Sequence, residues 1–260
     1  MRSIVRKMYG RRLLQSFFCR LHRVALLGMN HGPSPVPSEN GEKWFLRMLV
    51  KRYSGGVLFD VGANIGDYSE LLVGCQFPSE QIHSFEPSSV SYAQLVANAR
   101  LAGIHKNNIA LGSRSGESTL FSEKAGSGLS SLYKRNLPEK YGHIRNPETI
   151  TVSTIDEYCH MHNIVHIALL KIDVEGHELE VLRGGRNTLE GGRVDTIQFK
   201  IGMASLDAGV RLIDFLRLLE PRYEVFRLLK DGLWPVSRQD WSGHDEVFVM
   251  ANYIALAKHP

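Results

Sequence analysis

The feature that most constrains the fold is an alternation of short apolar runs with longer amphipathic runs between residues 41 and 260. The short runs have strand length and are rich in β-branched and aromatic residues, whereas the longer runs repeat their apolar residues at helical spacing. Strands that alternate with helices predict parallel β-α-β units. The expected strands are 57–61, 81–85, 167–172, 196–201, 223–228 and 246–255, and the expected helices are 67–73, 88–102, 177–189 and 210–219.

This pattern predicts an α/β protein with an open, doubly wound sheet of Rossmann type. The last strand follows 223–228 without an intervening helix, so we expect it to run antiparallel. No apolar run approaches the roughly 18 residues that a membrane-spanning helix needs. The three cysteines, Cys19, Cys75 and Cys159, are scattered and form no CxxC pair. This favours reduced thiols in the cytoplasm and argues against a cysteine zinc site.

The first 40 residues differ in composition from the rest of the chain. Residues 1–30 hold seven basic residues and no acidic one, which leaves 24 basic against 27 acidic residues in the remainder. The net charge of +4 therefore reflects a basic arm, and it gives no support to nucleic-acid binding by the main domain. We divide the chain into a basic amphipathic helix with a Pro-rich linker, 1–40, and a main domain, 41–260.

The arm predicts an amphipathic helix, because its apolar residues share one helical face and its arginines lie opposite. The apolar face holds Leu14, Phe17, Phe18, Leu21 and Val24, and the opposite face holds Arg12, Arg20 and Arg23. Three roles stay open: a helix packed on its own domain, a helix lying on an anionic membrane surface, and an organellar transit peptide. The segment lacks the apolar core and cleavage site of a secretory signal.

The first strand-to-helix junction reads LFDVGANIGD, residues 58–67. Gly62 and Gly66 permit a tight turn and close approach of a ligand, at the edge where open α/β sheets bind ligands. A carboxylate at Asp60 would repel the pyrophosphate of a dinucleotide but would favour the net cationic S-adenosylmethionine (SAM). The third glycine of the dinucleotide pattern is also missing, which disfavours an NAD-dependent oxidoreductase.

Glu86 ends the second expected strand, twenty residues after Gly66. At that distance a carboxylate is suited to accept both ribose hydroxyls of an adenosine. The alternative is a surface glutamate that stops the strand before Pro87. In combination with Asp60 and the loop glycines, Glu86 favours a methyl donor over NAD.

These segments and several later ones resemble the FkbM family of SAM-dependent O-methyltransferases. The resemblance covers roughly residues 55–255, through the blocks LFDVGANIGDYS, IHSFEPS, ALGSRSG, SSL, TVSTIDEYC, LLKIDVEGHELEVLRGG and IQF. It implies a Rossmann-like class I methyltransferase fold with a mostly parallel seven-stranded sheet and helices on both faces, SAM as the cofactor, and methyl transfer to a hydroxyl. The residues that it implies for SAM are Asp60, Gly62, Ala63, Asn64, Gly66, Glu86, Pro87, Ala110, Leu111 and Asp173.

The block KIDVEGHE follows the apolar strand 167–172 and brings ionisable groups to the carboxyl edge of the sheet. Asp173 is expected to lie closest to the transferred methyl group and the acceptor hydroxyl. Asp173, Glu175 and His177 are candidates for a general base, and histidine has the most suitable pKa. Glu175 or His177 could instead cap the next helix, and Glu178 is expected on a solvated face. A divalent metal held by this group is a further alternative, although D-x-E-x-H is not an established ligand spacing.

Lys200 departs from the family pattern, which leads us to expect a glutamate there. The lysine could pair with Asp173 or Glu175, bind an anionic acceptor, or mark lost or altered catalysis. In residues 117–147, we expect a lid over the acceptor built from Ser127, Ser130, Ser131, Tyr133 and Arg135, and Arg135 and Arg145 could recognise anionic groups.

The sequence therefore predicts a SAM-dependent O-methyltransferase that acts on a hydroxyl of a glycan or a secondary metabolite. A SAM-binding partner or sensor without catalysis is the alternative. We expect a small-molecule or glycan acceptor, no nucleic acid, and a peripheral membrane contact through residues 1–30 as an open alternative. Loops build acceptor pockets, so the fold does not name the acceptor.

Overall fold

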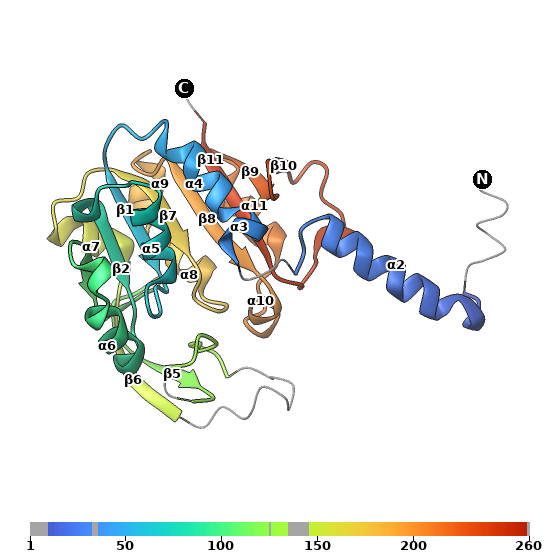
Figure 1. Ribbon diagram of the computed structural model, residues 1–260, viewed down its shortest axis with the longest axis horizontal. Helices are drawn as coiled ribbons and strands as arrows, with labels where there is room; N and C mark the ends of the chain where they lie inside the picture. Colours follow the sequence, from blue (N-terminus) through green and yellow to red (C-terminus); the bar gives the residue numbers. More distant parts are fainter. Residues whose placement is uncertain (1–9, 33–35, 125, 135–145, 259–260) are drawn as a thin grey trace.

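The computed structural model describes residues 10–32, 36–124, 126–134 and 146–258. Within these residues the chain forms a main sheet of eight strands in the order β10-β9-β11-β8-β7-β1-β2-β3, and a second sheet of three. Figure 1 shows the body of the molecule and a helix that extends away from it. The strands of the main sheet are β1 (Val57–Val61), β2 (Ile82–Phe85), β3 (His105–Asn107), β7 (Ile167–Ile172), β8 (Thr196–Ile201), β9 (Tyr223–Leu228), β10 (Leu233–Val236) and β11 (Ala251–Ala257).

The main sheet confirms the α/β class. Strands β3, β2, β1, β7 and β8 pair in parallel. The last strand, β11, lies between β8 and β9 and runs antiparallel to both, as expected. The strand count differs from the expected seven, because β10 folds back on β9 as a hairpin and adds an eighth strand at the edge.

Helices cover both faces of the main sheet (Figure 1). One layer consists of α4 (Glu42–Val50), α5 (Asp67–Gly74) and α6 (Ser89–Ala97). The other consists of α7 (Ile155–Met161), α8 (Glu178–Arg183), α9 (Arg186–Glu190) and α11 (Leu212–Leu219). Leu58 and Phe59, neighbours in β1, pack into opposite layers because successive side chains of a strand point to opposite faces.

Two expected elements differ in extent. The helix expected over 177–189 is two helices, with Gly184 and Gly185 between them. Gly184 packs so closely against the backbone of Gly112 that a side chain there would collide with it. The strand expected over 246–255 begins only at Ala251. Glu246 instead accepts hydrogen bonds from the backbone N–H groups of Leu212 and Ile213, at the start of α11.

The second sheet lies beside the carboxyl end of β2 and was not expected from the sequence. Its strands are β4 (Ala110–Leu111), β5 (Gly116–Ser122) and β6 (Asn146–Ser153), in the order β4-β6-β5. Strands β4 and β6 are parallel, and β5 and β6 are antiparallel. Short one-turn segments complete the described chain: η1 (Arg12–Leu14), α3 (Pro37–Asn40), η2 (Ser79–Gln81), η3 (Ala99–Leu101), α10 (Met203–Asp207) and η5 (Gly243–Asp245).

The N-terminal segment is joined to the body near residues 30–40. Helix α2 (Gln15–Gly28) forms where the sequence predicts one. The side-chain amide of Asn30 donates to the carbonyls of Asn40 and Leu228, and His31 is buried against Arg227. Pro37–Asn40, expected as a linker, forms a helical turn that begins with proline, which suits the first position of a helix. The domain boundary at residue 40 stays a prediction.

Candidate functional site

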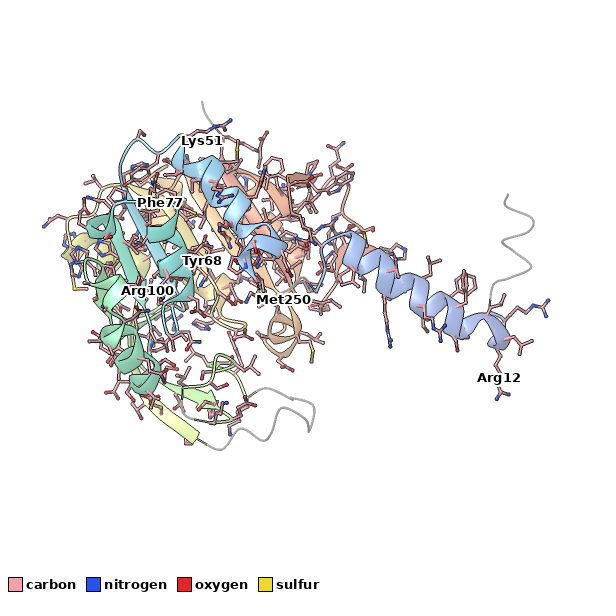
Figure 2. All side chains as sticks on the ribbon, viewed as in Figure 1. Arg12, Lys51, Tyr68, Phe77, Arg100 and Met250 are labelled. Atoms are coloured by element: carbon pink, nitrogen blue, oxygen red, sulfur yellow. The ribbon has the colours of Figure 1, made fainter. Side chains whose placement is uncertain are left out.

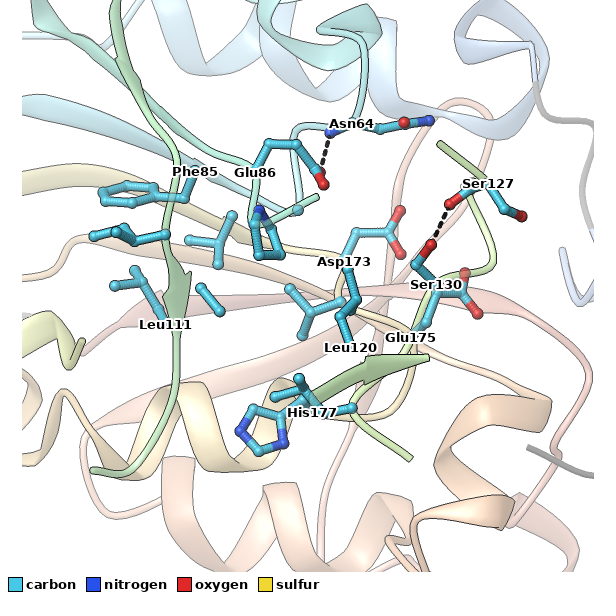
Figure 3. A pocket seen from close by; sticks show the side chains of 18 residues that line it. Asn64, Phe85, Glu86, Leu111, Leu120, Ser127, Ser130, Asp173, Glu175 and His177 are labelled. Atoms are coloured by element: carbon cyan, nitrogen blue, oxygen red, sulfur yellow. Dashed lines mark hydrogen bonds between the residues drawn. The ribbon is translucent and has the colours of Figure 1, made fainter. Parts of the chain in front are cut away.

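Polar residues gather at the carboxyl ends of β1, β2 and β7, which adjoin in the main sheet. A cavity that is partly open to solvent lies at this edge. Figure 3 shows it from close by. Its polar lining includes Asn64, Glu86, Ser127, Ser130, Asp173 and Glu175, and its apolar lining includes Phe85, Ile109, Leu111, Leu120 and Leu132.

Glu86 lies at the wall of this cavity, directly after β2, and is 7% exposed. One carboxylate oxygen accepts the backbone N–H of Asn64 at 2.8 Å, and the other accepts that of Ser88 at 2.9 Å. Burial raises the pKa of Glu86 to about 7, although the two N–H donors act in the opposite direction. The carboxylate is therefore held in a fixed orientation at the place the sequence predicts.

The loop after β1 needs its two glycines for contacts within the protein. Gly62 and Gly66 have positive φ angles of 81° and 101°. A Cβ atom at Gly62 would collide with the carbonyl of Asp173, and one at Gly66 would collide with Leu101. From the sequence we expected both glycines to permit close approach of a ligand. Gly62 does line the cavity, but Gly66 does not.

Asp60 has a different place from the one predicted. It is fully buried and lines none of the three cavities at this edge. Its carboxylate pairs with Lys171 Nζ at 2.8 Å and accepts a hydrogen bond from Ser69 Oγ at 2.7 Å. Lys171 neutralises the charge on which the prediction relied. Asp60 therefore stabilises the end of β1, just before the loop, through contacts inside the protein.

Asp173 and Lys200 form an ion pair at the end of β7 and in β8, with 2.5 Å between Oδ2 and Nζ. Burial alone would raise the pKa of Asp173, but Lys200 and Lys171 outweigh it and hold that pKa below its usual value. Burial alone would lower the pKa of Lys200, and Asp173 raises it instead. Both groups are therefore charged at neutral pH.

Two buried oxygen atoms at this edge have no hydrogen-bond partner among the described residues. They are Oδ1 of Asp173 and Oδ1 of Asn64. Both residues line the cavity of Figure 3. Buried polar atoms are nearly always hydrogen-bonded, so oxygens left over at a cavity wall are candidate ligand-binding atoms.

Two further cavities meet the first at Asp173 and Glu175, and Lys200 lines both of them. One is mainly apolar and lies against α10 and the segment before β11, with Met203, Ala204, Phe248, Val249 and Met250 in its wall. The other is polar and is lined by Asn40, Glu42, Ala63, Asn64, Tyr68, Lys171 and Asn252, among others. The Asp173–Lys200 pair thus stands between the first cavity and the other two.

Glu178 organises the loop that carries Asp173 and Glu175. It is 3% exposed, and its carboxylate accepts the backbone N–H groups of Val174 and Gly176 at 3.1 Å. The expectation of a solvated Glu178 is therefore wrong. Burial raises the pKa of Glu178 to about 7 despite these donors.

His177 stands apart from the Asp173–Lys200 pair. It lines the first cavity but neither of the other two. Its Nδ1 lies 3.2 Å from the Tyr133 hydroxyl, and Figure 3 shows the ring across the cavity from Asn64 and Glu86. Burial lowers the pKa of His177. No group of three His, Cys, Asp or Glu residues in the described part of the chain is arranged to hold a metal, so the alternative metal set finds no support.

Comparison with known proteins places this architecture in a family. A model of the methyltransferase FkbM domain matches residues 60–228, more than half of the chain. The chain belongs to the FkbM methyltransferase family. The match includes every residue that the sequence assigned to the site, from Asp60 to Lys200, and it confirms the resemblance.

The curated relatives of this FkbM chain are named as methyltransferases. Hexuronic acid methyltransferase AglP of Haloferax volcanii is 26% identical over 76% of this chain and 77% of its own length. The 31-O-demethyl-FK506 methyltransferase FkbM of Streptomyces tacrolimicus is 43% identical, over 24% of this chain and 25% of its own length. A crystal structure of methyltransferase FkbM from Methylobacillus flagellatus aligns with a TM-score of 0.44 and 18% identity, over 77% of this chain and 43% of that one.

The segment expected to form a lid over the acceptor instead contributes to the wall of the first cavity. Ser127 and Ser130 line it, and Ser131 Oγ donates to the carbonyl of Glu175 at 2.6 Å. Arg135 and Arg145 lie outside the described residues. Of the remaining predicted residues, Pro87, Ala110 and Leu111 line the first cavity and Ala63 lines the polar one.

Sequence reasoning missed a polar group centred on Glu42, which lies outside the recognised blocks of the FkbM domain. Glu42 accepts hydrogen bonds from the side-chain amides of Asn40, Gln198 and Asn252, at 2.8, 2.9 and 3.3 Å. Asn252 lies 210 positions from Glu42, so no local pattern could group these residues. Lys171 did give a signal, because it is a lone charge at the end of the buried run Ile167–Ile172.

Proposed function

We propose that this chain is a SAM-dependent O-methyltransferase that transfers a methyl group to a hydroxyl of a glycan or a secondary metabolite. One observation carries the proposal. A single cavity extends from the fixed carboxylate of Glu86 to the unpartnered oxygen of Asp173, and there it meets two cavities that could hold an acceptor. Membership of a methyltransferase family supports methyl transfer.

The lining of the first cavity fits SAM. Glu86 would accept hydrogen bonds from the ribose hydroxyls, and the apolar side chains of Ile109, Leu111 and Leu120 would flank the adenine. The unpartnered oxygens of Asn64 and Asp173 would accept from the ammonium group. When bound, SAM supplies a methyl group on a positively charged sulfur.

The chain's own contribution would be to align the acceptor hydroxyl with that methyl group. Fixing two reactants in register can supply most of the acceleration of such a displacement. Lys200 stays protonated next to Asp173, so it would not take up the hydroxyl proton. As the S–CH3 bond breaks and the O–CH3 bond forms, that proton would pass to the carboxylate of Glu175, which lines all three cavities. The Lys200 ammonium would donate a hydrogen bond to an acceptor oxygen, or attract an anionic acceptor.

An acidic sugar is the acceptor class that these charges favour. Lys200 lines both acceptor-side cavities, and the amides and carboxylate around Glu42 line the polar one, a mixture suited to a sugar carboxylate and its hydroxyls. The relative in Haloferax volcanii is named for hexuronic acid and the one in Streptomyces tacrolimicus for demethyl-FK506. Acidic and neutral sugars therefore form the first acceptor screen.

The cofactor is tested by calorimetric titration with SAM, S-adenosylhomocysteine and NAD. We expect micromolar binding of both sulfur compounds and none of NAD. Glu86→Gln should weaken SAM binding by about 100-fold, since it removes a charged acceptor. Glu80→Gln, at an exposed glutamate, is the matched control and should bind as the unmodified chain does. Binding of NAD alone, or equal SAM affinity in both variants, would reject the proposed site.

A SAM-binding partner or sensor is the second candidate function. The observation that favours it is the contact of Lys200 with Asp173, because it occupies the carboxylate expected closest to the acceptor. Formation of S-adenosylhomocysteine with any acceptor in the screen would exclude this candidate. SAM binding without product from any acceptor would favour it.

A further inference from the structure

Helix α2 exposes an apolar face that no part of the described chain covers. Of its fourteen residues only Leu26 is buried. Phe17, Leu21, Val24 and Leu27 are between 50% and 65% exposed, and Leu13 just before the helix is 96% exposed. Figure 1 shows the helix extending away from the body. The alternative in which this helix packs on its own domain is therefore wrong.

The charges around this face select its partner. Arg11, Arg12, Arg20 and Arg23 are exposed along the same segment, and residues 1–30 contain no acidic side chain. Arg12 and Arg23 lie on the side of the helix opposite to Phe17 and Leu21. A helix with an aromatic and aliphatic face and an arginine face matches an anionic bilayer, in which acyl chains take the first face and headgroups the second.

The base of the helix adjoins the apolar cavity on the acceptor side. Gly32 lines that cavity and lies against Val249. Met29, Met203 and Val249, around this junction, are 39%, 48% and 40% exposed. The apolar surface of the helix therefore continues toward the rim of the cavity.

We propose that helix α2 binds the surface of an anionic membrane and holds the apolar cavity beside Lys200 close to the bilayer. None of the described helices is long and apolar enough to cross a membrane. The contact is interfacial, with the helix axis in the plane of the headgroups. The proposal concerns a surface outside the cofactor cavity, and it does not depend on the proposed methyl transfer.

Vesicle sedimentation of the full chain tests this. Vesicles of phosphatidylcholine alone are compared with vesicles that also contain phosphatidylglycerol, and we expect binding only to the second kind. Arg20→Glu with Arg23→Glu should lower the apparent binding constant for the vesicles by at least about 25-fold, at roughly fivefold for each basic residue lost near an anionic surface. Phe17→Ser with Leu21→Ser should also abolish sedimentation, because it removes the apolar face.

Each helix variant has a matched control on the body. Lys51→Glu with Arg52→Glu makes the same change in charge at exposed positions, and Figure 2 shows Lys51 far from Arg12. Met161→Ser with Val165→Ser removes two apolar side chains that are 57% and 75% exposed. Both controls should sediment as the unmodified chain does.

Several results would overturn the proposal. These are no binding to anionic vesicles, equal binding to both kinds of vesicle, and equal loss in the controls and the helix variants. A dimer in vesicle-free solution that the helix variants disrupt, without binding to vesicles, would assign the face to a second copy of the chain. SAM titration of every variant separates the two proposals, since loss of vesicle binding with intact SAM binding concerns the helix alone.

Discussion

At the amino-terminal edge of the main sheet, buried polar groups hydrogen-bond to one another. At the carboxyl edge, two buried oxygen atoms have no hydrogen-bond partner among the described residues. His83, at the amino edge, is 6% exposed, stacks on His105 with 4.3 Å between ring centroids, and has its Nδ1 2.8 Å from the Tyr158 hydroxyl. That hydroxyl also lies 3.1 Å from Oδ1 of Asn107. A tyrosine has one hydroxyl hydrogen, which goes to the amide oxygen, so His83 donates from Nδ1.

The carboxyl edge also holds buried ionisable groups, but not all of their polar atoms are hydrogen-bonded within the described residues. Glu86 and Glu178 have backbone donors, and Asp60 has Lys171, but Asp173 and Asn64 each retain a buried oxygen that accepts nothing from the described residues. A histidine-rich cavity also exists at the amino edge, lined by His83, His105, His162 and His166. Unsatisfied acceptors, more than the number of ionisable residues or the presence of a cavity, therefore distinguish the candidate site from the core.

The largest expected effect concerns the partnered ion pair beneath the site. Asp60→Asn leaves the Lys171 charge buried without its partner, so we expect the free energy of unfolding to fall by about 3–5 kcal/mol. Urea denaturation measures it. Glu190→Gln breaks the exposed pair with Arg186 and serves as the control, with an expected change below about 0.5 kcal/mol. Loss of SAM binding with unchanged stability would show instead that Asp60 acts on the ligand.

The free energy of unfolding should fall in acid because of His83 at the amino edge. Burial, with smaller contributions from His105 and His162, lowers the pKa of His83 to about 4. Its folded pKa lies below the unfolded value of about 6.5, so the unfolded chain takes up the proton first. The stabilisation is complete above pH 6.5 and is lost as the pH falls toward 4, by about 2 kcal/mol between pH 7 and 5.

Urea denaturation at pH 7 and pH 5 tests the effect of His83. His83→Gln should lose about 2 kcal/mol less than the unmodified chain over this interval. His244→Gln, at an exposed histidine, is the control and should follow the unmodified chain. Identical pH dependence in all three proteins would mean that His83 keeps an ordinary pKa and that the amino edge is solvated.

At the carboxyl edge, acid should weaken the affinity for SAM. Burial raises the pKa of Glu86 to about 7, so a proton competes with the ribose hydroxyls below that pH. We expect the Kd for SAM to rise roughly thirtyfold from pH 8 to pH 5.5, as the ionised fraction of a group with this pKa falls. Calorimetry over the pH series measures it. Glu86→Gln should bind weakly with little dependence on pH, and a steep dependence in that variant would assign the titration to another group.

Strands of buried apolar residues were the most predictable part of this molecule. The bounds of Val57–Val61, Ile167–Ile172, Thr196–Ile201 and Tyr223–Leu228 agree with the structure residue for residue, because their side chains alone identify them as strands. The second sheet was missed because Gly116–Ser122 and Asn146–Ser153 are rich in polar residues and pair with distant partners, Asn146–Ser153 with both β4 and β5.

Partners distant in the sequence account for the errors at the site. The role predicted for Asp60 rested on its charge, and its neutralising partner Lys171 lies 111 residues away. His177 was grouped with Asp173 because the two are close in sequence, but its ring faces Tyr133, 44 residues away. The position of Glu86 directly after β2 agrees with the sequence, since a buried strand followed by proline marks the edge of the sheet.

The smallest expected effect is at the pair that separates the cavities. Lys200→Glu would put two carboxylates in contact, so that one of them takes up a proton near neutral pH and Asp173 loses its fixed charge. We expect the rate of S-adenosylhomocysteine formation, measured with the acceptor found in the screen, to fall at least about tenfold, or about 1.4 kcal/mol. The Kd for SAM should rise as well, because Asp173 lines the first cavity and its charge would favour the ammonium group of SAM.

Lys200→Met separates the two consequences of that change. It removes the cation without adding a carboxylate, so Asp173 keeps the nearby charge of Lys171 and its pKa rises less than in Lys200→Glu. A rate that falls equally in both variants would assign Lys200 to binding of the acceptor. A rate that falls only in Lys200→Glu would show that the charge of Asp173 matters. Unchanged rates in both variants would place Lys200 outside the site, and Asp173 and Asn64 alone would then distinguish the carboxyl edge from the amino edge.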